Sequence, residues 1–472
     1  MAVVSEKAIS QKEEVVDKKL VRMSLYYAFV WLLVGMLGGV LTSIKFNYPD
    51  FLGYIPWLAF GRLRVFHLNG VAFGWFTTAA FGMAYYMVPK LTGIKMVWPK
   101  VSYVVVYSWA VVSTIGQISL LAGYSQGVEV GEWPVWVDVP VSMIFALITT
   151  QIFFTIANRK EKHIYVSLWY LTAGFTWSTI NYVLGNLINP YFFAGVDNAA
   201  IQGFYLHSVV GLWITPMGTA MLYYFMPVIT KNPVYSHKLS MIGFWGLALF
   251  YPFTGAHHYL FSPIDTWVQT IAIMSSMMLI MPVWSVITNQ VGTMKGKWHM
   301  LSSHIEVKFM VLGAVFYVIT CFQGPTQALR SMQQIIHFTD WVVGHAHLAI
   351  YGVFTMWTWA GIYYIWPKLT GRQIYSQKLS GWHFWLSLVG FAIMALTLWG
   401  AGLVQGGMLN LESNVAFIDT VKAISPFWAV RTVGGTLMML GAACFVYNMY
   451  MTAKVGRLVD EDFVSNRQEV LV

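Results

Sequence analysis

The chain has 472 residues, of which 57% are hydrophobic and 10% are charged. A soluble protein carries roughly a quarter charged residues, so this composition excludes a soluble globular domain. The net charge of +9 would suit a nucleic-acid-binding protein, but the basic residues gather in short loops between apolar segments.

Apolar runs of about 20 residues, each long enough to cross a bilayer, recur along the chain. They predict an all-α integral membrane protein with twelve transmembrane helices at residues 23–43, 65–88, 102–123, 138–157, 165–188, 202–226, 239–262, 267–290, 305–329, 341–366, 380–404 and 426–450. These helices form a single membrane domain, 23–452, between polar tails at 1–22 and 453–472. The first tail has no apolar core, so we do not expect a cleaved signal peptide.

The loops on the two sides of the membrane differ in positive charge. With twelve spans both tails lie on one side, which then holds 22 of the 28 lysines and arginines; the other side holds Lys45, Arg62, Arg64, Arg330, Lys422 and Arg431. By the positive-inside rule, both termini are cytoplasmic. The basic residues therefore orient the chain, and no nucleic-acid partner is expected.

A sequence repeat divides the membrane domain. The segments YYMVPKLTG, YYFMPVITK and YYIWPKLTG begin at Tyr85, Tyr223 and Tyr363, at nearly equal intervals. A second pair of matched segments begins at Tyr235 and Tyr375, with the same offset as the pair at Tyr223 and Tyr363. The repeat predicts three pseudo-symmetric units of four helices, arranged around a pseudo-threefold axis or in a row.

An alternative for twelve spans is a secondary transporter. Transporters commonly contain inverted repeats and helices broken near the middle of the membrane. A repeat of four spans is an even number, so the units share one orientation, which does not favour that alternative.

Each repeat carries histidine upstream of its YYxxP motif. His67 and His345 precede the motif tyrosine of their repeat by the same distance, and His207 and His347 share a slightly shorter one. At 1.5 Å per residue, all four lie roughly 30 Å from the cytoplasmic end of their spans. On a span of opposite direction, His257 and His258 follow Lys238 by a similar length of chain and reach the same depth.

A single histidine in a membrane is more often a packing residue or a proton relay than a metal ligand. Six at one depth favour metal binding, because imidazole suits haem iron and copper. His345 and His347 point about 200° apart on a helix, so they cannot share one metal but can each bind a separate haem. His257, His258 and His207 can converge on one ion, as in a copper site with three histidines.

These residues resemble a known family. GAHH at 255–258, the histidine of the sixth span and HxxDWxxGHxH at 337–347 are similar to the catalytic subunit of haem–copper oxygen reductases, in particular the C family of cbb3-type cytochrome c oxidases. The resemblance covers all twelve spans and implies the haem–copper oxidase subunit I fold. It also implies that His67 and His347 bind a low-spin haem b, that His345 binds a high-spin haem b, and that His207, His257 and His258 hold one copper ion.

The resemblance further implies a function and partners. The chain would reduce dioxygen to water in the bacterial cytoplasmic (inner) membrane, coupled to proton uptake and pumping. Its only cysteines, Cys321 and Cys444, form no CxxCH motif, so it cannot attach a c-type haem by itself. Membrane-anchored c-type cytochrome subunits would therefore supply the electrons.

Two further site residues follow from the resemblance. Tyr251, six residues before His257, matches a tyrosine covalently joined to the copper ligand of span six, which implies a His207–Tyr251 bond. A phenol beside the metals can deliver one electron and one proton to the splitting of O–O. Gln323 stands where the family usually has a glutamate that hydrogen-bonds the proximal histidine, so a higher potential of the high-spin haem is expected.

Nitric oxide reductase activity is the alternative within the same family. Those relatives use non-haem iron with a glutamate four residues after the histidine of span six, where this chain has Gly211. Iron favours an added carboxylate and copper does not need one. The motif HHY at 257–259, however, resembles the reductases as much as the oxidases.

Protons from the cytoplasm must cross most of the bilayer to reach metals at this depth. Tyr223, Ser240 and Tyr317, followed by Tyr251, form a predicted path similar to the single K-channel analogue of the C family.

Residues at the outer ends of the spans are candidates for the haem edges. The predicted partners of the haem propionates are Arg62, Arg64, Arg330, His337 and Asp340, because propionates need cationic or hydrogen-bonding groups. Glu129 and Glu132 resemble a segment that contributes to a calcium site in the family, although their spacing differs.

Overall fold

The computed structural model describes residues 14–411 and 414–459, and these residues form helices and loops with one isolated β-bridge, between Arg372 and Leu458. The predicted tails at 1–22 and 453–472 lie partly outside the described residues. The predicted all-α fold is confirmed.

Eleven of the described helical segments are long and apolar enough to cross a membrane. They are α1 (Lys18–Asn47); α2 (Phe60–Asn69) continued by η3 (Gly70–Thr77) and α3 (Thr78–Thr92); α4 (Pro99–Ala122); α5 (Val135–Ala157); α8 (Gly195–Ser208) continued by η5 (Val209–Ile214) and α9 (Thr215–Thr230); α10 (His237–Phe250) continued by η6 (Tyr251–Phe253) and η7 (Gly255–Tyr259); α11 (Thr266–Met278) with α12 (Ile280–Thr293); α13 (Ile305–Gln327); α15 (Asp340–His347) continued by η9 (Leu348–Thr355) and α16 (Met356–Thr370); α17 (Gln377–Leu411); and α18 (Phe417–Val455). Shorter elements are η2 (Pro56–Leu58), α7 (Asn189–Phe192), η8 (Trp298–Ser302) and α14 (Arg330–Ile336).

The segment predicted as the fifth span is helical but falls outside this set of eleven. It consists of α6 (Val166–Tyr182), which is 17 residues long, continued by the π-helix η4 (Val183–Ile188). Threonine, serine and asparagine side chains interrupt its apolar surface, as at Thr176, Ser178 and Asn181. Eleven spans are therefore shown by length and composition among the described residues, and α6–η4 lies at the position of the predicted fifth span.

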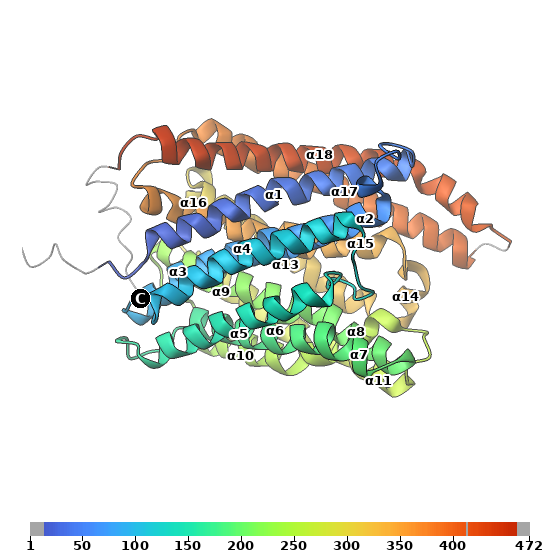
Figure 1. Ribbon diagram of the computed structural model, residues 1–472, viewed down its shortest axis with the longest axis horizontal. Coiled ribbons are helices and arrows are strands. Elements are labelled where there is room, and N and C mark those ends of the chain that lie inside the picture. The colour runs from blue at the N-terminus through green and yellow to red at the C-terminus, as the bar shows by residue number, and fades with distance from the viewer. Residues whose placement is uncertain (1–13, 412–413, 460–472) are drawn as a thin grey trace, which may run out of the picture.

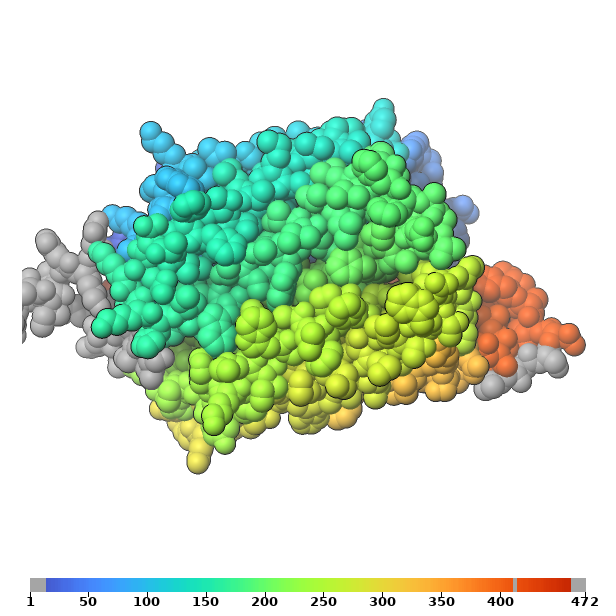
Figure 2. All heavy atoms as spheres, turned by 90° about the horizontal axis from the view of Figure 1, so that it is seen from below, coloured from blue at the N-terminus to red at the C-terminus, as the bar shows by residue number. Residues whose placement is uncertain are grey.

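The helices run side by side, and the start of α1 and the end of α18 lie at the same end of the bundle (Figure 1). This end also carries the basic loops after α3, α9 and α16. At the opposite end, α17 and α18 extend beyond their neighbours, which is also visible from below (Figure 2). These helices have 35 and 39 residues, so each is more than about 50 Å long and exceeds the hydrocarbon thickness of a bilayer.

Each of the three segments with the YYxxP motif contains a π-helix that begins one to three residues after a histidine. η3 (Gly70–Thr77) follows His67, η5 (Val209–Ile214) follows His207, and η9 (Leu348–Thr355) follows His347. A π-helical turn is wider than an α-turn, changes the direction of the side chains after it, and is frequent at functional sites. The Thr77 hydroxyl donates to the Ala72 carbonyl, 3.0 Å away, and so supports the widened turn.

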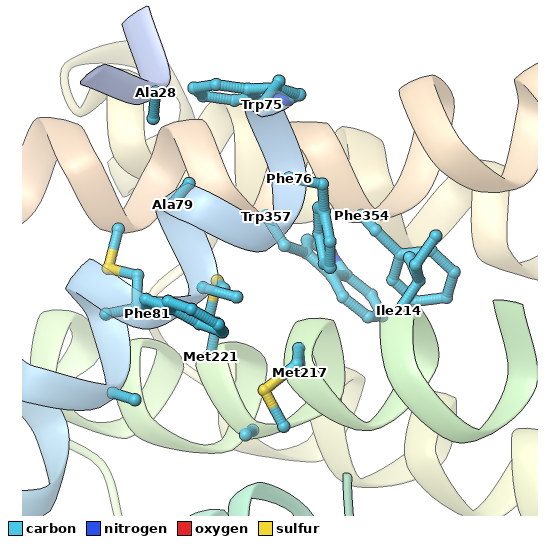
Figure 3. Close-up of a cluster of buried hydrophobic side chains, with 14 of the residues drawn as sticks. Ala28, Trp75, Phe76, Ala79, Phe81, Ile214, Met217, Met221, Phe354 and Trp357 are labelled. Carbon is cyan, nitrogen blue, oxygen red and sulfur yellow. The ribbon is translucent and has the colours of Figure 1, made fainter. Parts of the chain in front are cut away.

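These three segments pack against one another in the centre of the bundle. Side chains from all three meet in one buried cluster, for example Trp75, Met217 and Trp357 (Figure 3). Mutual contact excludes an arrangement of the units in a row and supports the pseudo-threefold axis.

Hydrogen bonds between the units follow this symmetry in part. Trp75 Nε1 donates to Thr355 Oγ1 (3.1 Å), and Trp213 Nε1 donates to Thr77 Oγ1 (2.8 Å). By the repeat spacing the third donor would stand at residue 353, which is a valine. Two of the three equivalent links are therefore made.

Candidate metal centre

All six histidines that the sequence singles out line one cavity. Its volume is about 570 Å³, and its wall includes His67, His207, His257, His258, His345 and His347. Aliphatic side chains such as Leu206, Val210 and Val283 form much of the rest of the wall. The predicted common depth of the histidines therefore corresponds to one continuous site.

Three of these histidines form a cluster that could hold a metal ion. One ligand atom from each of His207, His257 and His258 lies within 4.8 Å of the other two. His207 Nδ1 is 2.8 Å from His258 Nε2. His207 of α8 thus lies next to His257 and His258 of the short 3-10 helix η7. The predicted copper site with three histidines requires this arrangement.

Ser276 on α11 fixes the tautomer of His257, although no sequence motif marks this serine. The Ser276 hydroxyl donates to the Ala272 carbonyl (2.7 Å), so its oxygen accepts from His257 Nδ1–H (2.7 Å). His257 Nε2 is then the unprotonated nitrogen, and it is buried without a hydrogen-bond partner among the described residues. A metal ion suits this orphaned lone pair, since a second hydrogen bond of this kind commonly orients a ligating histidine.

Tyr251 lies against the histidine cluster. Its ring is stacked on that of His207, with centroids 4.9 Å apart and an interplanar angle of 24°. The space for this ring comes from Gly211, because a Cβ atom there would lie 1.5 Å from Cε1 of Tyr251. The position at which nitric oxide reductases carry a glutamate therefore has no room for any side chain while Tyr251 holds this place.

His67 and His347 face each other across the cavity. Their ring centroids are 6.2 Å apart and their planes differ by 18°. Each Nδ1 donates to a backbone carbonyl at 2.8 Å, that of Gly35 for His67 and that of Val343 for His347. Both Nε2 atoms are therefore unprotonated and available as ligands.

The separation of the His67 and His347 rings would allow both to bind one metal. For each ring, a metal–imidazole bond is about 2 Å long and the ring centre lies about 1 Å beyond the nitrogen. Two rings on one metal would therefore have centroids roughly 6 Å apart. Gly39 of α1 makes room for one ring, since a Cβ atom there would lie 2.6 Å from Cε1 of His67. The residues present thus fit a low-spin haem between them.

His345 lines the same cavity and lies close to Gly324 of α13. Its Nδ1 is 3.3 Å from Gln323 Oε1 and donates to this amide oxygen. The predicted contact between the proximal histidine and Gln323 is therefore present in the structure, with a neutral acceptor in place of a carboxylate.

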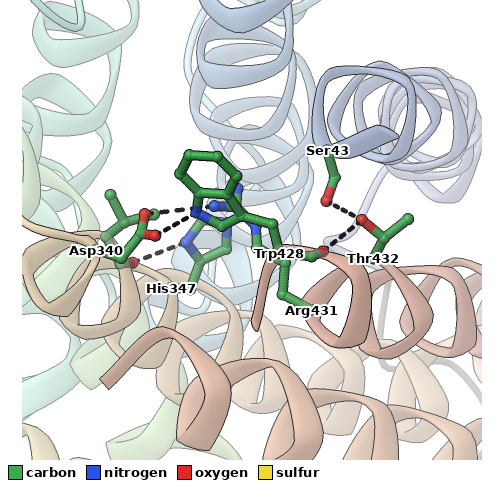
Figure 4. Close-up of polar contacts among 7 residues, drawn as sticks. Ser43, Asp340, His347, Trp428, Arg431 and Thr432 are labelled. Atoms are coloured by element: carbon green, nitrogen blue, oxygen red, sulfur yellow. Dashed lines mark hydrogen bonds and ion pairs between the residues drawn. The ribbon is translucent and has the colours of Figure 1, made fainter. Parts of the chain in front are cut away.

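A buried ion pair lies beside the His67–His347 pair. Asp340 accepts hydrogen bonds from Trp428 Nε1 (2.6 Å) and from Arg431 Nη1 (3.4 Å), and both charged side chains are 12% exposed (Figure 4). Arg431 also lies over the ring of Phe46, 4.6 Å from its centroid. Arg431 and Asp340 both line the cavity, so a cationic group reaches the site from α18, although the sequence places this arginine only among the outer charges.

The other predicted propionate partners separate into two groups. Arg64 and His337 line the cavity, and His337 Nδ1 is buried without a partner among the described residues. Arg62 donates to the Leu121 carbonyl (3.0 Å) and Arg330 to Thr270 Oγ1 (3.2 Å), and neither lines the cavity. The structure thus supports a role at the cavity for Arg64, His337 and Asp340 and gives none for Arg62 and Arg330.

Glu129 and Glu132, the candidates for calcium, have different partners. Glu129 forms an exposed ion pair with Arg64 at 3.4 Å. Glu132 is buried and accepts from Asn69 Nδ2 at 2.7 Å. Burial raises the pKa of the Glu132 carboxyl above its ordinary value, against the hydrogen bond from Asn69, which lowers it. A calcium site at these residues stays a prediction.

The first part of the predicted proton path forms one hydrogen-bonded group through a residue that no sequence motif marks. Asn289 Nδ2 on α12 donates at 3.0 Å to both Tyr223 Oη and Ser240 Oγ. Tyr170 of α6 stacks on Tyr223, with centroids 5.8 Å apart, and its hydroxyl is buried without a partner among the described residues. Tyr317 lines the cavity together with Tyr251.

Comparison with known proteins identifies the family. The description "Cytochrome C and Quinol oxidase polypeptide I" matches residues 19–437. The chain belongs to this family. As an oxidase subunit I it is a membrane-embedded enzyme component of the haem–copper oxidase type, which uses haem and copper and works with other subunits.

Individual relatives agree with this assignment. The oxidase subunit is 32% identical to the cbb3-type cytochrome c oxidase subunit CcoN1 of Stutzerimonas stutzeri, over 94% of this chain and 96% of the relative. It is 23% identical to a nitric oxide reductase chain of the same organism, over 91% of this chain and 94% of the relative. Its fold matches a haem–copper terminal oxidase dimer solved by cryo-EM, with a TM-score of 0.78 at 15% identity, over 94% of this chain and 85% of that chain. These relationships leave no support for the transporter alternative.

Proposed function

We propose that this chain is the catalytic subunit of a cbb3-type cytochrome c oxidase and that it reduces dioxygen to water in a bacterial inner membrane. The proposal rests on the arrangement of the six cavity histidines. Two of them face each other, three form a cluster, and one stands by itself. A facing pair suits a low-spin haem b, three converging imidazoles suit copper, and a single histidine suits a five-coordinate, high-spin haem b.

Each residue has a defined role in this proposal. His67 and His347 hold the low-spin haem through Nε2, and His345 holds the high-spin haem. His207, His257 and His258 hold the copper, with Ser276 keeping His257 in the required tautomer. When bound, the haem iron and the copper would supply electrons to dioxygen.

Tyr251 and the histidine beside it complete the site. Reduction of one dioxygen to two waters takes four electrons and four protons, and the Tyr251 phenol is placed to give one of each. The face-to-face contact of the Tyr251 and His207 rings supports the covalent bond between them. His207 turns Nδ1 toward His258, so its Nε2 remains available for that bond.

Oxygen rather than nitric oxide is the proposed substrate because of Gly211. A reductase-type glutamate at this position would collide with Tyr251, and iron would lose the carboxylate that it favours. Nitric oxide reduction remains the alternative substrate of the same centre, and it is tested below with the same preparation.

Protons and electrons reach the site from opposite sides in this proposal. The excess of basic residues at the end where α1 begins and α18 ends supports a cytoplasmic location of that end. Protons would pass from there through Tyr223, Asn289 and Ser240 toward Tyr317 and Tyr251. Membrane-anchored c-type cytochrome subunits would deliver electrons at the outer end, close to Asp340 and Arg431.

The proposal is tested on the purified complex. We expect one copper ion and two b haems in this subunit, a carbon monoxide shift of one haem, and oxygen consumption with reduced cytochrome c that exceeds nitric oxide consumption. His257→Ala should remove the copper and oxygen consumption while both haems remain. Non-haem iron in place of copper, or faster turnover of nitric oxide, would contradict the proposal.

A further inference from the structure

The outward side of α11 and α12 carries four methionines in a row. Met274, Met277 and Met278 lie at the end of α11 and Met281 at the start of α12, and each side chain is at least 38% exposed. Positions i, i+3, i+4 and i+7 share one face of a helix, with neighbouring Cβ atoms about 5–6 Å apart. α11 lies at the edge of the bundle (Figure 1), so this face, which we call the methionine face, points away from the other helices.

Exposed methionines are concentrated on this face. In the part of the chain that the structure describes, only Met143 and Met241 are exposed to a similar degree elsewhere. The other large hydrophobic side chains on the surface of the bundle are aliphatic or aromatic. A general preference for methionine at the membrane surface therefore does not explain the four that lie together.

The methionine face is particular to the second repeat unit. Gln151, Asn289 and Asn448 donate the same hydrogen bond to a serine of their own unit, which aligns α5 and α18 with α11–α12. With this alignment, the positions of the four methionines are occupied by Trp136, Val139, Pro140 and Met143 in the first unit and by Val433, Thr436, Leu437 and Leu440 in the third. Only the unit that contains the three-histidine cluster thus has four thioethers on this face.

The opposite side of the same helix pair lies against that cluster. Ser276, which accepts a hydrogen bond from His257 Nδ1, is the residue next to Met277. Ser276, Leu279 and Val283 line the cavity, and α11 packs against η7, which carries His257. The methionine face and the unpartnered His257 Nε2 are therefore separated by the thickness of one helix, about 10 Å.

The helix between the methionine face and the cavity is interrupted. α11 ends at Met278 and α12 begins at Ile280, with Leu279 between them. Pro282 has no N–H group to donate to the Met278 carbonyl, so the regular hydrogen-bond ladder cannot continue across this point. Helices bend at such positions. The cavity wall therefore has a point beside Leu279 at which it can open.

Four thioether groups on one face suit a soft metal ion. Thioether sulfur selects Cu(I), whereas Mg²⁺ and Ca²⁺ prefer carboxylate and carbonyl oxygen. Methionine side chains are flexible, so sulfur atoms from two adjacent helical turns can converge on one ion. The exposed side chains that flank the face on the same helices, Trp267, Ile271 and Trp284, include no carboxylate. The methionine face therefore has the ligands for Cu(I) and lacks those for a hard cation.

We propose that the methionine face binds Cu(I) and passes it to His257, His207 and His258 when the copper centre is assembled. The inference rests on the proposed function, because it requires copper at these three histidines. The transfer is an exchange of ligands, in which copper–sulfur bonds break while copper–nitrogen bonds form, the first of them to His257 Nε2. Copper stays Cu(I) throughout, so no electron is transferred.

The copper content of the complex from cells grown at limiting copper tests this role in assembly. The combined variant carries Met274→Leu, Met277→Leu, Met278→Leu and Met281→Leu, and it should fold because leucine and methionine have similar volumes. It should lose most of its copper at limiting copper while both haems remain. Growth in copper-rich medium should restore the copper, since the histidines are intact, and a merely structural role would not give this rescue.

Met143→Leu together with Met241→Leu is the matched control. These substitutions also remove exposed methionines, and Met143 stands at the first-unit position equivalent to Met281. Because neither residue lies on the methionine face, this variant should keep its copper at limiting and at high copper.

Binding to the face itself is measured on the purified complex by titration with Cu(I) in the absence of oxygen. The wild-type protein should bind Cu(I) in addition to its resident copper, and X-ray absorption should show sulfur neighbours around the added ion. The combined variant should not bind this ion. Cys321 and Cys444 are present in both proteins, so the difference reports the methionines alone.

Failure of this inference can be distinguished from failure of the proposed function. Equal copper content of the wild type and the combined variant at limiting copper, or equal Cu(I) binding by the two, would overturn the inference. Loss of a partner subunit from the combined variant, with its copper unchanged, would identify the face as a contact for another transmembrane helix and would also overturn it. A wild-type complex without copper would overturn the proposed function, and this inference with it.

Discussion

Gly211 and Tyr251 are in such close contact that a Cβ atom on residue 211 would lie 1.5 Å from Cε1 of the tyrosine ring. The contact joins the helix that provides His207 to the one that provides His257 and His258. It fixes the place of the phenol next to the three-histidine cluster.

Substitution of Gly211 tests this role. Gly211→Ala should displace the Tyr251 ring by an ångström or more and reduce oxygen consumption by at least about 100-fold, since misplacements of this size have such effects on rate. Oxygen electrode measurements and the carbon monoxide difference spectrum report the change. Gly407→Ala, in open space on α17, should retain activity; equal activity of the two variants would refute the role of the contact.

The Ser276–His257 hydrogen bond should support copper binding. Ser276→Ala leaves the His257 ring free to rotate or change tautomer, so copper affinity should fall about 10–100-fold. Copper content after dialysis against a graded series of chelator concentrations measures this. Ser285→Ala, which removes only a hydroxyl bonded to the Met281 carbonyl of its own helix, should keep its copper.

The neutral acceptor at Gln323 should set the potential of the high-spin haem. Gln323→Glu gives His345 a charged acceptor, so its imidazole gains electron density, the ferric state is stabilised and the potential falls. Redox titration and the iron–histidine stretching frequency, which should rise, measure the effect. Gln323→Met, which removes the acceptor, should shift both quantities in the opposite direction; identical spectra for all three proteins would contradict the assignment of His345.

The Asp340–Arg431 pair should matter more for stability than an exposed pair. Arg431→Ala leaves a nearly buried carboxylate without its counter-charge, which costs about 3–5 kcal/mol, and it should lower the thermal stability and the low-spin haem content. Lys422→Ala breaks the exposed Lys422–Asp419 pair, whose side chains are 71% and 53% exposed, and should change stability by less than about 1 kcal/mol. Thermal unfolding and the reduced haem spectrum compare the two.

Asn289 should be part of proton uptake. Asn289→Leu removes the link between Tyr223 and Ser240, so turnover should slow while haem and copper content remain complete. Oxygen consumption would be measured between about pH 6 and 9 in roughly unit steps. A larger loss of turnover at high pH, where protons are scarce, would separate impaired proton supply from damage to the metal site. Unchanged turnover at every pH would exclude this path.

Much of the fold and of the ligand set could be predicted from residue spacing. Apolar runs of about twenty residues identify spans because a bilayer requires them, and the fixed distance between each histidine and its YYxxP motif gives the depth of His67, His207 and His345. The predicted span at 165–188 corresponds to the helical segment α6–η4, which falls outside the eleven because polar residues reduce its apolar signal.

Other features could not be predicted because they depend on contacts between distant segments. Nothing in the residues after His207 signals that the helix widens into a π-turn there. Ser276, Asn289 and Arg431 are ordinary polar residues of their helices until folding brings them to His257, to Tyr223 or to Asp340. The direction of Arg62 and Arg330 away from the cavity is likewise set by local partners, Leu121 and Thr270, rather than by their position near the ligands.

Val353 stands where the repeat would place a third tryptophan, and this affects the surroundings of Tyr251. In the first and third units the equivalent threonine is occupied by an indole N–H from a neighbouring unit, but Thr215 of the second unit is not, and its hydroxyl instead interacts with Tyr251. The three repeat units can thus share one interior and still differ at a site. Because the third unit lacks the indole donor at residue 353, the Thr215 hydroxyl of the second unit remains available. The second unit, which carries His207, is therefore the one whose threonine contacts Tyr251.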